Sequence, residues 1–187
     1  MNDPVTAAFE AAPREEFLPR SRRGQASYDG PLDIGHGQTN SQPRTVSAML
    51  RLLDVRPGDR VLDVGSGSGW TTALLGHLTG PSGEVTGVEI EPDLVAFGAG
   101  NLARVGPSWT RIVPAVPGVL GLPDQAPYDR ILVSADAHRL PDELVDQLCP
   151  GGRMVLPVSG TMLLVEKDDE GEPLVTQHGS YRFVPLV

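Results

Sequence analysis

Cysteine is almost absent from the sequence. Cys149 is the only cysteine among 187 residues, so no disulfide can form within the chain, as is usual for proteins of reducing compartments. It lies in the run Leu-Cys-Pro-Gly-Gly at 148–152, which is typical of a helix that ends in a turn. We therefore expect a small packed side chain here rather than a nucleophilic thiol.

Basic residues are also scarce. The chain has 15 lysines and arginines against 24 aspartates and glutamates, which gives a formal net charge of −9 and a pI near 4.8. Proteins that bind nucleic acid usually carry a positively charged surface for the phosphates. We therefore expect no nucleic-acid partner.

Long hydrophobic runs are missing. No stretch reaches the roughly 20 apolar residues of a transmembrane helix, and residues 1–12 lack the positive charge and apolar core of a secretory signal. We expect a cytoplasmic protein without a membrane partner. The length and the 40% hydrophobic content fit a single domain over residues 1–187, which we expect to be a monomer.

Several catalytic patterns are absent as well. The four histidines, His36, His77, His138 and His178, show no metal-ligand spacing, and no Gly-x-Ser-x-Gly nucleophile motif occurs. The sequence therefore predicts neither a metal site nor a nucleophilic serine of that kind.

The most informative stretch is Arg60–Trp70, in which a short apolar run leads into alternating glycines. Residues 61–64 read Val-Leu-Asp-Val and are typical of a buried parallel strand. Gly65, Gly67 and Gly69 permit backbone conformations and close approaches that a Cβ atom would prevent. The pattern predicts a strand, a tight loop on which a ligand can lie, and the start of a helix.

A second apolar run, Glu84–Glu89, ends in an acidic residue 24 positions after Gly65. A carboxylate at this place can accept hydrogen bonds from a ribose diol, so the two runs predict a βαβ unit that binds a nucleoside. A dinucleotide is disfavoured, because G-x-G-x-x-G requires glycine where Trp70 stands. A glycine-rich turn that binds no nucleoside is the alternative.

The rest of the chain alternates between helical and extended patterns. We expect helices over Pro4–Ala12, over the segment from Pro43 that buries Val46, Met49, Leu50 and Leu53, and over Pro92–Arg104 and Pro141–Leu148. Further strands are expected over Arg111–Val113, Tyr128–Ser134 and Arg153–Val158, followed by an antiparallel hairpin of Thr161–Lys167 and Leu174–Val184. The predicted fold is α/β, a mostly parallel seven-stranded sheet with a C-terminal antiparallel hairpin and helices on both faces.

The N-terminal part differs from the rest in its pattern. Residues 1–55 are expected to hold helices and a substrate loop, and residues 56–187 the nucleoside-binding core. Pro19–Gln42 shows little periodicity and many glycines, serines and aspartates, which predicts a long irregular segment. Irregular segments of this length in a compact domain are usually functional or disordered.

Three motifs carry a resemblance to a known family. Asp63-x-Gly65-x-Gly67-x-Gly69 with the later Glu89 resembles motif I and the acidic loop of methyltransferases that use S-adenosyl-L-methionine (SAM). Leu32-x-Ile34-Gly35-x-Gly37-Gln38-Thr39-x-Ser41-x-Pro43 resembles the signature loop of protein-L-isoaspartate O-methyltransferases, and Pro13-Arg14-Glu15-x-Phe17-x-Pro19 resembles their N-terminal element. The likeness extends in collinear order over nearly the whole chain.

This resemblance implies a Rossmann-like methyltransferase fold, SAM as cofactor, and a peptide or protein with isoaspartyl residues as the substrate whose methylation starts repair. It implies cofactor contacts from Asp63, Gly65, Ser66, Gly67, Gly69, Glu89, Ile90 and Gly118. It implies acceptor contacts from Gln38, Thr39 and Ser41, with Ser41 as the catalytic residue that holds the substrate carboxylate. An alternative role for Ser41 is to cap the helix that follows. Tyr28 and Asp29 either line the peptide cleft or form a turn.

One departure from the family bears on affinity. Val116-Pro117-Gly118 stands where the family has Gly-Asp-Gly, whose acid meets the adenine amino group. Proline cannot accept that hydrogen bond, so the sequence predicts weaker SAM binding than motif I alone suggests. Two alternatives stay open beside isoaspartyl methylation: a SAM-dependent enzyme for a dedicated peptide or small carboxylic acid, and a degenerate SAM-binding protein that acts through a partner.

Overall fold

The central strands are those of the predicted glycine unit. In the computed structural model, which describes residues 3–187, β3 (Arg60–Val64) pairs in parallel with β4 (Glu84–Glu89) on one side and β6 (Tyr128–Val133) on the other. β5 (Thr110–Pro114) pairs with β4, and β7 (Leu148–Val158) pairs with β6, both in parallel. Because the chain runs outward from β3 in both directions, β3 marks the switch point where open α/β sheets bind ligands.

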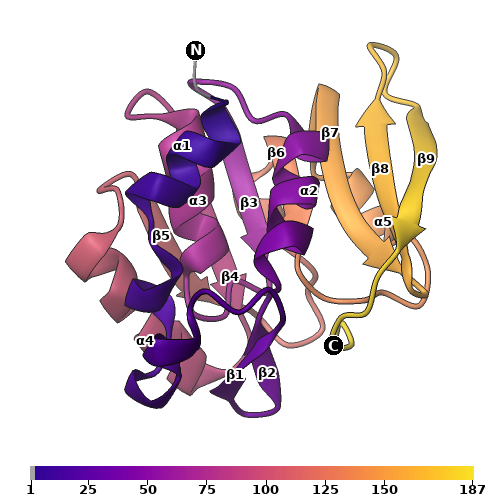
Figure 1. The fold of residues 1–187 in the computed structure, drawn as a ribbon. Helices are drawn as coiled ribbons and strands as arrows, with labels where there is room; N and C mark the ends of the chain where they lie inside the picture. Colours follow the sequence, from indigo (N-terminus) through magenta and orange to yellow (C-terminus); the bar gives the residue numbers. More distant parts are fainter. Residues whose placement is uncertain (1–2) are drawn as a thin grey trace.

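The C-terminal strands close the sheet as expected. β8 (Thr161–Lys167) and β9 (Pro173–Ser180) are both antiparallel to their neighbours, and the full order is β5-β4-β3-β6-β7-β8-β9 (Figure 1). The prediction of a seven-stranded, mostly parallel sheet with an antiparallel C-terminal hairpin is confirmed. β9 ends at Ser180, four residues earlier than predicted, and an irregular segment follows it.

Helices cover both faces of the sheet, because successive strand residues point to opposite sides. On one face, Val61 and Leu132 share a core with three helices, α1 (Pro4–Ala11), α2 (Pro43–Leu53) and α3 (Trp70–Thr79), and with Leu102 of α4 (Pro92–Val105). On the other, Leu62 and Ile131 share a core with the short α5 (Asp142–Val145). The N-terminal helices therefore pack into the same core as the sheet.

The segment predicted to be irregular, Pro19–Gln42, contains regular structure, so that prediction is wrong. It holds a 3₁₀ helix at Arg20–Gln25 and an antiparallel hairpin of β1 (Leu32–Gly35) and β2 (Gln38–Asn40). The tight turn has a positive φ at Gly35, His36 and Gly37. The glycines that suggested a loop instead permit the left-handed backbone of a hairpin turn.

The helix predicted over Pro141–Leu148 is also shorter than expected. α5 ends at Val145, and β7 begins at Leu148, so Cys149 lies in a strand rather than at a helix end. The side chain of Gln147 accepts from Leu122 N–H and donates to the Leu120 carbonyl, which ties the chain to the preceding loop where a helix would continue. Burial raises the pKa of the Cys149 thiol, as expected for a packed side chain.

No helix within residues 3–187 combines the length and the apolar character that a membrane crossing requires.

Candidate functional site

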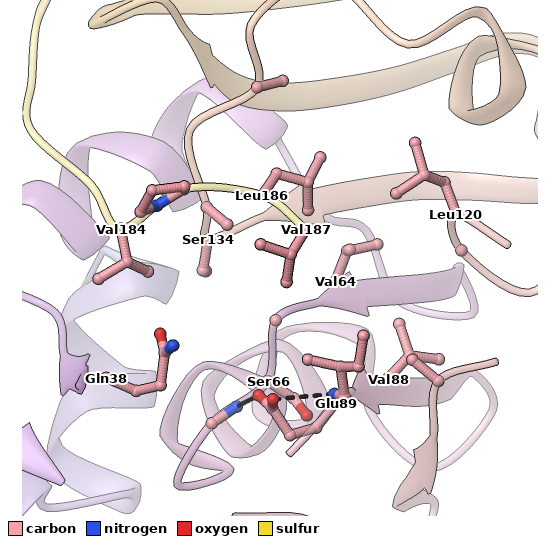
Figure 2. Close-up of a pocket in the computed structure, with 18 of the residues that line it drawn as sticks. Gln38, Val64, Ser66, Val88, Glu89, Leu120, Ser134, Val184, Leu186 and Val187 are labelled. Carbon is pink, nitrogen blue, oxygen red and sulfur yellow. Dashed lines mark hydrogen bonds between the residues drawn. The ribbon is translucent and has the colours of Figure 1, made fainter. Parts of the chain in front are cut away.

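A cavity of about 390 Å³ opens at the carboxyl ends of β3, β4 and β6 (Figure 2). It is lined by the predicted cofactor residues Gly65, Ser66, Gly67, Glu89, Ile90 and Gly118, and by the predicted acceptor residues Gln38, Thr39 and Ser41. The size is in the range of small-molecule sites. The structure thus brings two sets of residues from separate parts of the sequence to one place.

Two backbone hydrogen bonds fix the glycine loop after β3 to the neighbouring strand β4. The N–H groups of Gly65 and Ser66 both donate to the carbonyl of Val88 on the neighbouring strand, at 3.0 and 3.1 Å. Gly67 has φ of 50°, and a Cβ atom there would lie 3.2 Å from Ile34 Cδ1 of the β1–β2 hairpin. Glycine is required at this point both by the backbone conformation and by the narrow gap between loop and hairpin.

Gly69 serves a different purpose from the other two glycines. It does not line the cavity; it is the N-cap of α3, with φ of 82°. A Cβ atom at Gly69 would lie 3.0 Å from the carbonyl oxygen of Gly98 in α4. Gly69 therefore lets α3 and α4 approach each other behind the site.

Glu89 is fixed at the edge of the cavity by three backbone donors. Its Oε2 accepts from Gly67 N–H at 2.8 Å, and its Oε1 accepts from the N–H groups of Ile90 and Glu91 at 2.9 and 3.0 Å. These bonds join the end of β4 to the glycine loop. The carboxylate is thereby fixed beside the glycine loop at the cavity wall, where the sequence predicted a ribose contact.

Asp63 lies under the loop and is completely buried. Its Oδ2 accepts from the hydroxyl groups of Thr71 and Thr72, both at 2.7 Å, while Oδ1 has no hydrogen-bond partner within residues 3–187. Burial raises the pKa of this carboxyl to about 6. Asp63 does not line the cavity, so it reaches a ligand only through Thr71, which does.

The cavity fits a nucleoside cofactor in two respects. Ser66 lines it, and the Oγ of this residue is buried with no partner among the described residues, a polar group that the chain itself leaves unsatisfied. Ile90, Val116 and Val119 line it with partly exposed apolar side chains, and apolar groups gathered in a cavity are typical of a ligand site. A flat apolar ring with a polar edge would cover them.

Pro117 lies between two cavity residues but is not one itself. Val119 N–H donates to the Val116 carbonyl at 2.9 Å, and Gly118 has φ of 79°. This is the arrangement of a type II turn, with proline and glycine at its two corners. Pro117 is therefore a turn residue that stands exposed beside the predicted adenine pocket.

The acceptor residues lie on the hairpin and just after it. Ser41 lines the cavity, but the N-cap of α2 is Gln42, so the alternative role of Ser41 as the cap is wrong. The N-terminus of α2 is instead satisfied by Asp29, whose Oδ1 accepts from Arg44 N–H at 3.1 Å. This bond lowers the pKa of Asp29 and makes it a capping residue. Neither Asp29 nor Tyr28 lines the cavity.

Part of the cavity wall was missed in the sequence. It consists of Ser134, His138 and Arg139 after β6 and of the segment Val184–Val187, which faces Ser66 and Glu89 across the cavity in Figure 2. The segment is held by Leu186 N–H, which donates to the carbonyl of Asp136. The part of the wall after β6 could have been predicted from a parallel pairing of β6 with β3, because the carboxyl ends of adjacent parallel strands share one edge of the sheet.

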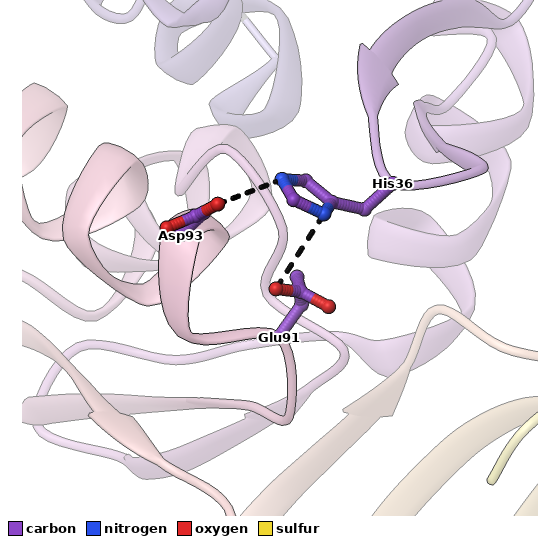
Figure 3. Close-up of side chains that lie close together, drawn as sticks. All are labelled: His36, Glu91 and Asp93. Carbon is purple, nitrogen blue, oxygen red and sulfur yellow. Dashed lines mark ion pairs between the residues drawn. The ribbon is translucent and has the colours of Figure 1, made fainter.

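His36 forms a second, exposed contact between the hairpin and the cofactor segments (Figure 3). Its Nδ1 lies 3.5 Å from Glu91 Oε1, and its Nε2 lies 3.2 Å from Asp93 Oδ2 at the start of α4. No spacing in the sequence predicts this cluster, yet the three side chains lie close together. Each ring nitrogen faces a different carboxylate, so His36 joins the hairpin to both acidic residues, just after β4 and at the start of α4.

Comparisons with known proteins agree with this geometry. A family model described as protein-L-isoaspartate(D-aspartate) O-methyltransferase matches residues 1–187. The chain is 45% identical over 189 residues to a protein-L-isoaspartate O-methyltransferase of Methanopyrus kandleri, with 98% of this chain and 83% of the relative covered.

Solved structures extend the similarity to the fold. One protein-L-isoaspartate O-methyltransferase superposes with a TM-score of 0.89 at 28% identity, over all of this chain and 62% of its own length. A putative one from Plasmodium falciparum, in complex with S-adenosyl-L-homocysteine (SAH), gives a TM-score of 0.85 at 27% identity, over all of this chain and 92% of its own. The chain therefore belongs to the protein-L-isoaspartate(D-aspartate) O-methyltransferase family.

Proposed function

We propose that this protein transfers a methyl group from SAM to the free carboxylate of isoaspartyl residues in peptides or proteins. One observation carries the proposal: the glycine loop with Glu89 and the acceptor residues Gln38, Thr39 and Ser41 line the same cavity. A methyl donor and a carboxylate bound to these two sets would meet inside it. The shared hydrophobic core of α1, α2 and the sheet supports one domain over residues 1–187.

The residues on the cofactor side are matched to the parts of SAM. Gly65 and Gly67 would pass under the methionine part, Glu89 would accept from the ribose hydroxyls, and Ile90 with Val116 would cover adenine. SAM, when bound, supplies a methyl carbon on a positively charged sulfur. The acceptor pocket has to bring a carboxylate oxygen into line with that carbon and to exclude water.

The acceptor side needs orientation rather than proton transfer. A carboxylate is already ionised at neutral pH, and its oxygen forms the new C–O bond while the electrons of the broken C–S bond remain on sulfur. No proton moves, so the site requires no general base. We propose that Ser41 holds the acceptor carboxylate or its adjoining backbone, with Gln38 and Thr39 shaping the pocket.

The test compares two peptides that differ only in the linkage of one residue. Methyl transfer from labelled SAM is measured with an isoaspartyl peptide and with its normal aspartyl counterpart. We expect transfer to the isoaspartyl peptide alone. Transfer to neither peptide, with SAH binding intact in calorimetry, would overturn the isoaspartyl assignment and favour a dedicated acceptor or a non-catalytic role.

A further inference from the structure

A chain of buried hydrogen bonds joins the acceptor hairpin to the glycine loop. Asn40 is the last residue of β2 and directly precedes Ser41, and Ser68 lies between Gly67 and Gly69. The Asn40 side-chain nitrogen donates to Ser68 Oγ at 3.1 Å. Asn40 is 4% exposed and Ser68 is 3% exposed, although both line the cavity.

The orientation of the Asn40 amide is fixed by its second partner. Arg14 Nε, which can only donate, lies 2.6 Å from Asn40 Oδ1. The oxygen therefore faces Arg14, and the amide nitrogen has to face Ser68. The Asn40 side chain thus accepts a hydrogen bond from Arg14 of the N-terminal element and donates one to Ser68 of the glycine loop.

Arg14 makes this link rigid. Its guanidinium is buried and donates to the backbone carbonyls of Tyr28, Gly30, Asn40 and Ser41, at 2.8 to 3.1 Å. The positive charge of Arg14 is thus shared among carbonyl groups of residues 28–41, the stretch that ends at Ser41. Ser68, Asn40 and Arg14 thus form one buried hydrogen-bonded network that runs from the glycine loop to the backbone of Ser41, and satisfied buried networks of this kind are rigid.

We propose that Asn40 is a positioning residue that couples acceptor binding at Ser41 to cofactor binding at the glycine loop. The inference rests on the proposed function, since it takes the isoaspartyl peptide as the acceptor. A ligand on the glycine loop stabilises the position of Ser68 and, through Asn40, the bound arrangement of Ser41. By linkage, the acceptor raises cofactor affinity by the same factor. The exposed His36 pairs contribute little to this coupling, because surface ion pairs are weak.

The experiment measures the affinity of a labelled isoaspartyl peptide with and without saturating SAH, which permits binding but no turnover. The ratio of the two dissociation constants is the coupling factor, expected to be at least about fivefold in the wild type. In Asn40→Ala we expect this factor to fall to within about twofold of one. Ser68→Ala removes the same link without leaving Arg14 unpaired, and we expect the same loss.

Asn101→Ala is the matched control. The Asn101 side-chain nitrogen donates to the backbone carbonyl of Ser68 at 3.0 Å, and Asn101 is as buried as Asn40 but lies on α4. We expect this variant to keep the coupling factor, even where its melting temperature falls as far as that of Asn40→Ala. A purely structural role of Asn40 would lower the melting temperature and leave the coupling factor unchanged.

The outcomes separate this inference from the proposed function. An unchanged factor in Asn40→Ala or Ser68→Ala, or a factor of one in the wild type, overturns the coupling role while peptide binding still supports isoaspartyl recognition. A wild-type protein that binds SAH but never the isoaspartyl peptide overturns both.

Discussion

Gly67 and Glu89 are joined by a hydrogen bond of 2.8 Å from the backbone N–H of the glycine to Oε2 of the carboxylate. The bond links the loop after β3 to the end of β4, two segments that both line the cavity. Glu89 therefore holds the glycine loop in place, and under the proposed function it has a second task, to present a carboxylate to the ribose.

This double task predicts a combined loss in Glu89→Gln. The carboxylate accepts from backbone N–H groups at both oxygens, so the amide nitrogen of glutamine would have to face a donor on one side. An unpaired buried donor costs about 1–3 kcal/mol, and we expect a melting temperature lower by roughly 2–10 °C. We also expect SAH affinity to fall at least about tenfold. Scanning fluorimetry and calorimetry measure the two effects.

Glu84→Gln is the control for this prediction. Glu84 begins the same strand and forms ion pairs with Arg60 and Arg111 at a partly exposed position, and it does not line the cavity. Such pairs contribute about 0–1 kcal/mol, so SAH affinity should stay unchanged. An equal loss of affinity in both variants would contradict a direct role of Glu89.

Gly67→Val should remove the rise in melting temperature that SAH produces. Valine would be strained at a φ of 50°, and its Cβ would crowd Ile34 Cδ1 across the loop–hairpin gap. Gly80→Val is the control, since Gly80 also has a positive φ, 67°, at the C-cap of α3 but has no atom within 4 Å of the added Cβ. Both variants should be less stable without ligand. Only Gly80→Val should keep the rise in melting temperature on adding SAH. A rise retained in Gly67→Val would show that the cofactor does not bind on the glycine loop.

The buried Asp63 predicts a pH dependence of stability. Burial raises the pKa of its carboxyl from 3.8 to about 6, so between these pH values the folded protein keeps a proton that the unfolded chain has released. The free energy of unfolding therefore falls as the pH rises through this range, by about 3 kcal/mol in total. In Asp63→Asn the amide oxygen still accepts from Thr71 and Thr72, and this contribution to the slope disappears.

The measurement is denaturant unfolding of both proteins between pH 4 and pH 7. Other carboxyl groups titrate in the same range, so the informative quantity is the difference between the two free energies at each pH. We expect the wild type to lose about 2 kcal/mol of this contribution relative to Asp63→Asn across the range. A difference that stays constant with pH would mean that Asp63 titrates normally in spite of its burial.

Local patterns were sufficient for most of the sheet and for the cofactor side of the cavity. The run before Gly65 and the run that ends in Glu89 are short apolar segments with clear boundaries, and the strand–loop–helix pattern fixes where their ends meet. The hairpin of Leu32–Asn40 was missed because strands of four and three residues around a Gly-His-Gly turn have too few alternations to show a period.

Contacts between distant residues were beyond the sequence pattern. Arg14, Asn40 and Ser68 are separated by 26 and 28 positions along the chain, and no spacing rule connects them. Likewise, the motif identified Pro117 as an unusual residue, but only the structure shows that it lies at a turn corner that does not line the cavity. Side-chain direction at such positions depends on the turn, which one residue type does not determine.

The last prediction concerns Ser41, whose hydroxyl we expect to control turnover rather than cofactor affinity or stability. Gln42 is the N-cap of α2, so replacing Ser41 does not remove a helix cap, and Arg14 binds the Ser41 backbone carbonyl, which alanine retains. Ser41→Ala should therefore keep the wild-type melting temperature and SAH dissociation constant. Its single-turnover rate with an isoaspartyl peptide should fall by about 10- to 100-fold, since a lost hydrogen bond to a charged group costs roughly 1.5–3 kcal/mol.

Thr45→Ala, in the first turn of α2 and outside the cavity, is the control and should keep the wild-type rate. A Ser41→Ala protein with a normal rate would place the acceptor carboxylate elsewhere in the cavity, whereas a lower melting temperature with a normal rate would give Ser41 a structural role despite the Gln42 cap.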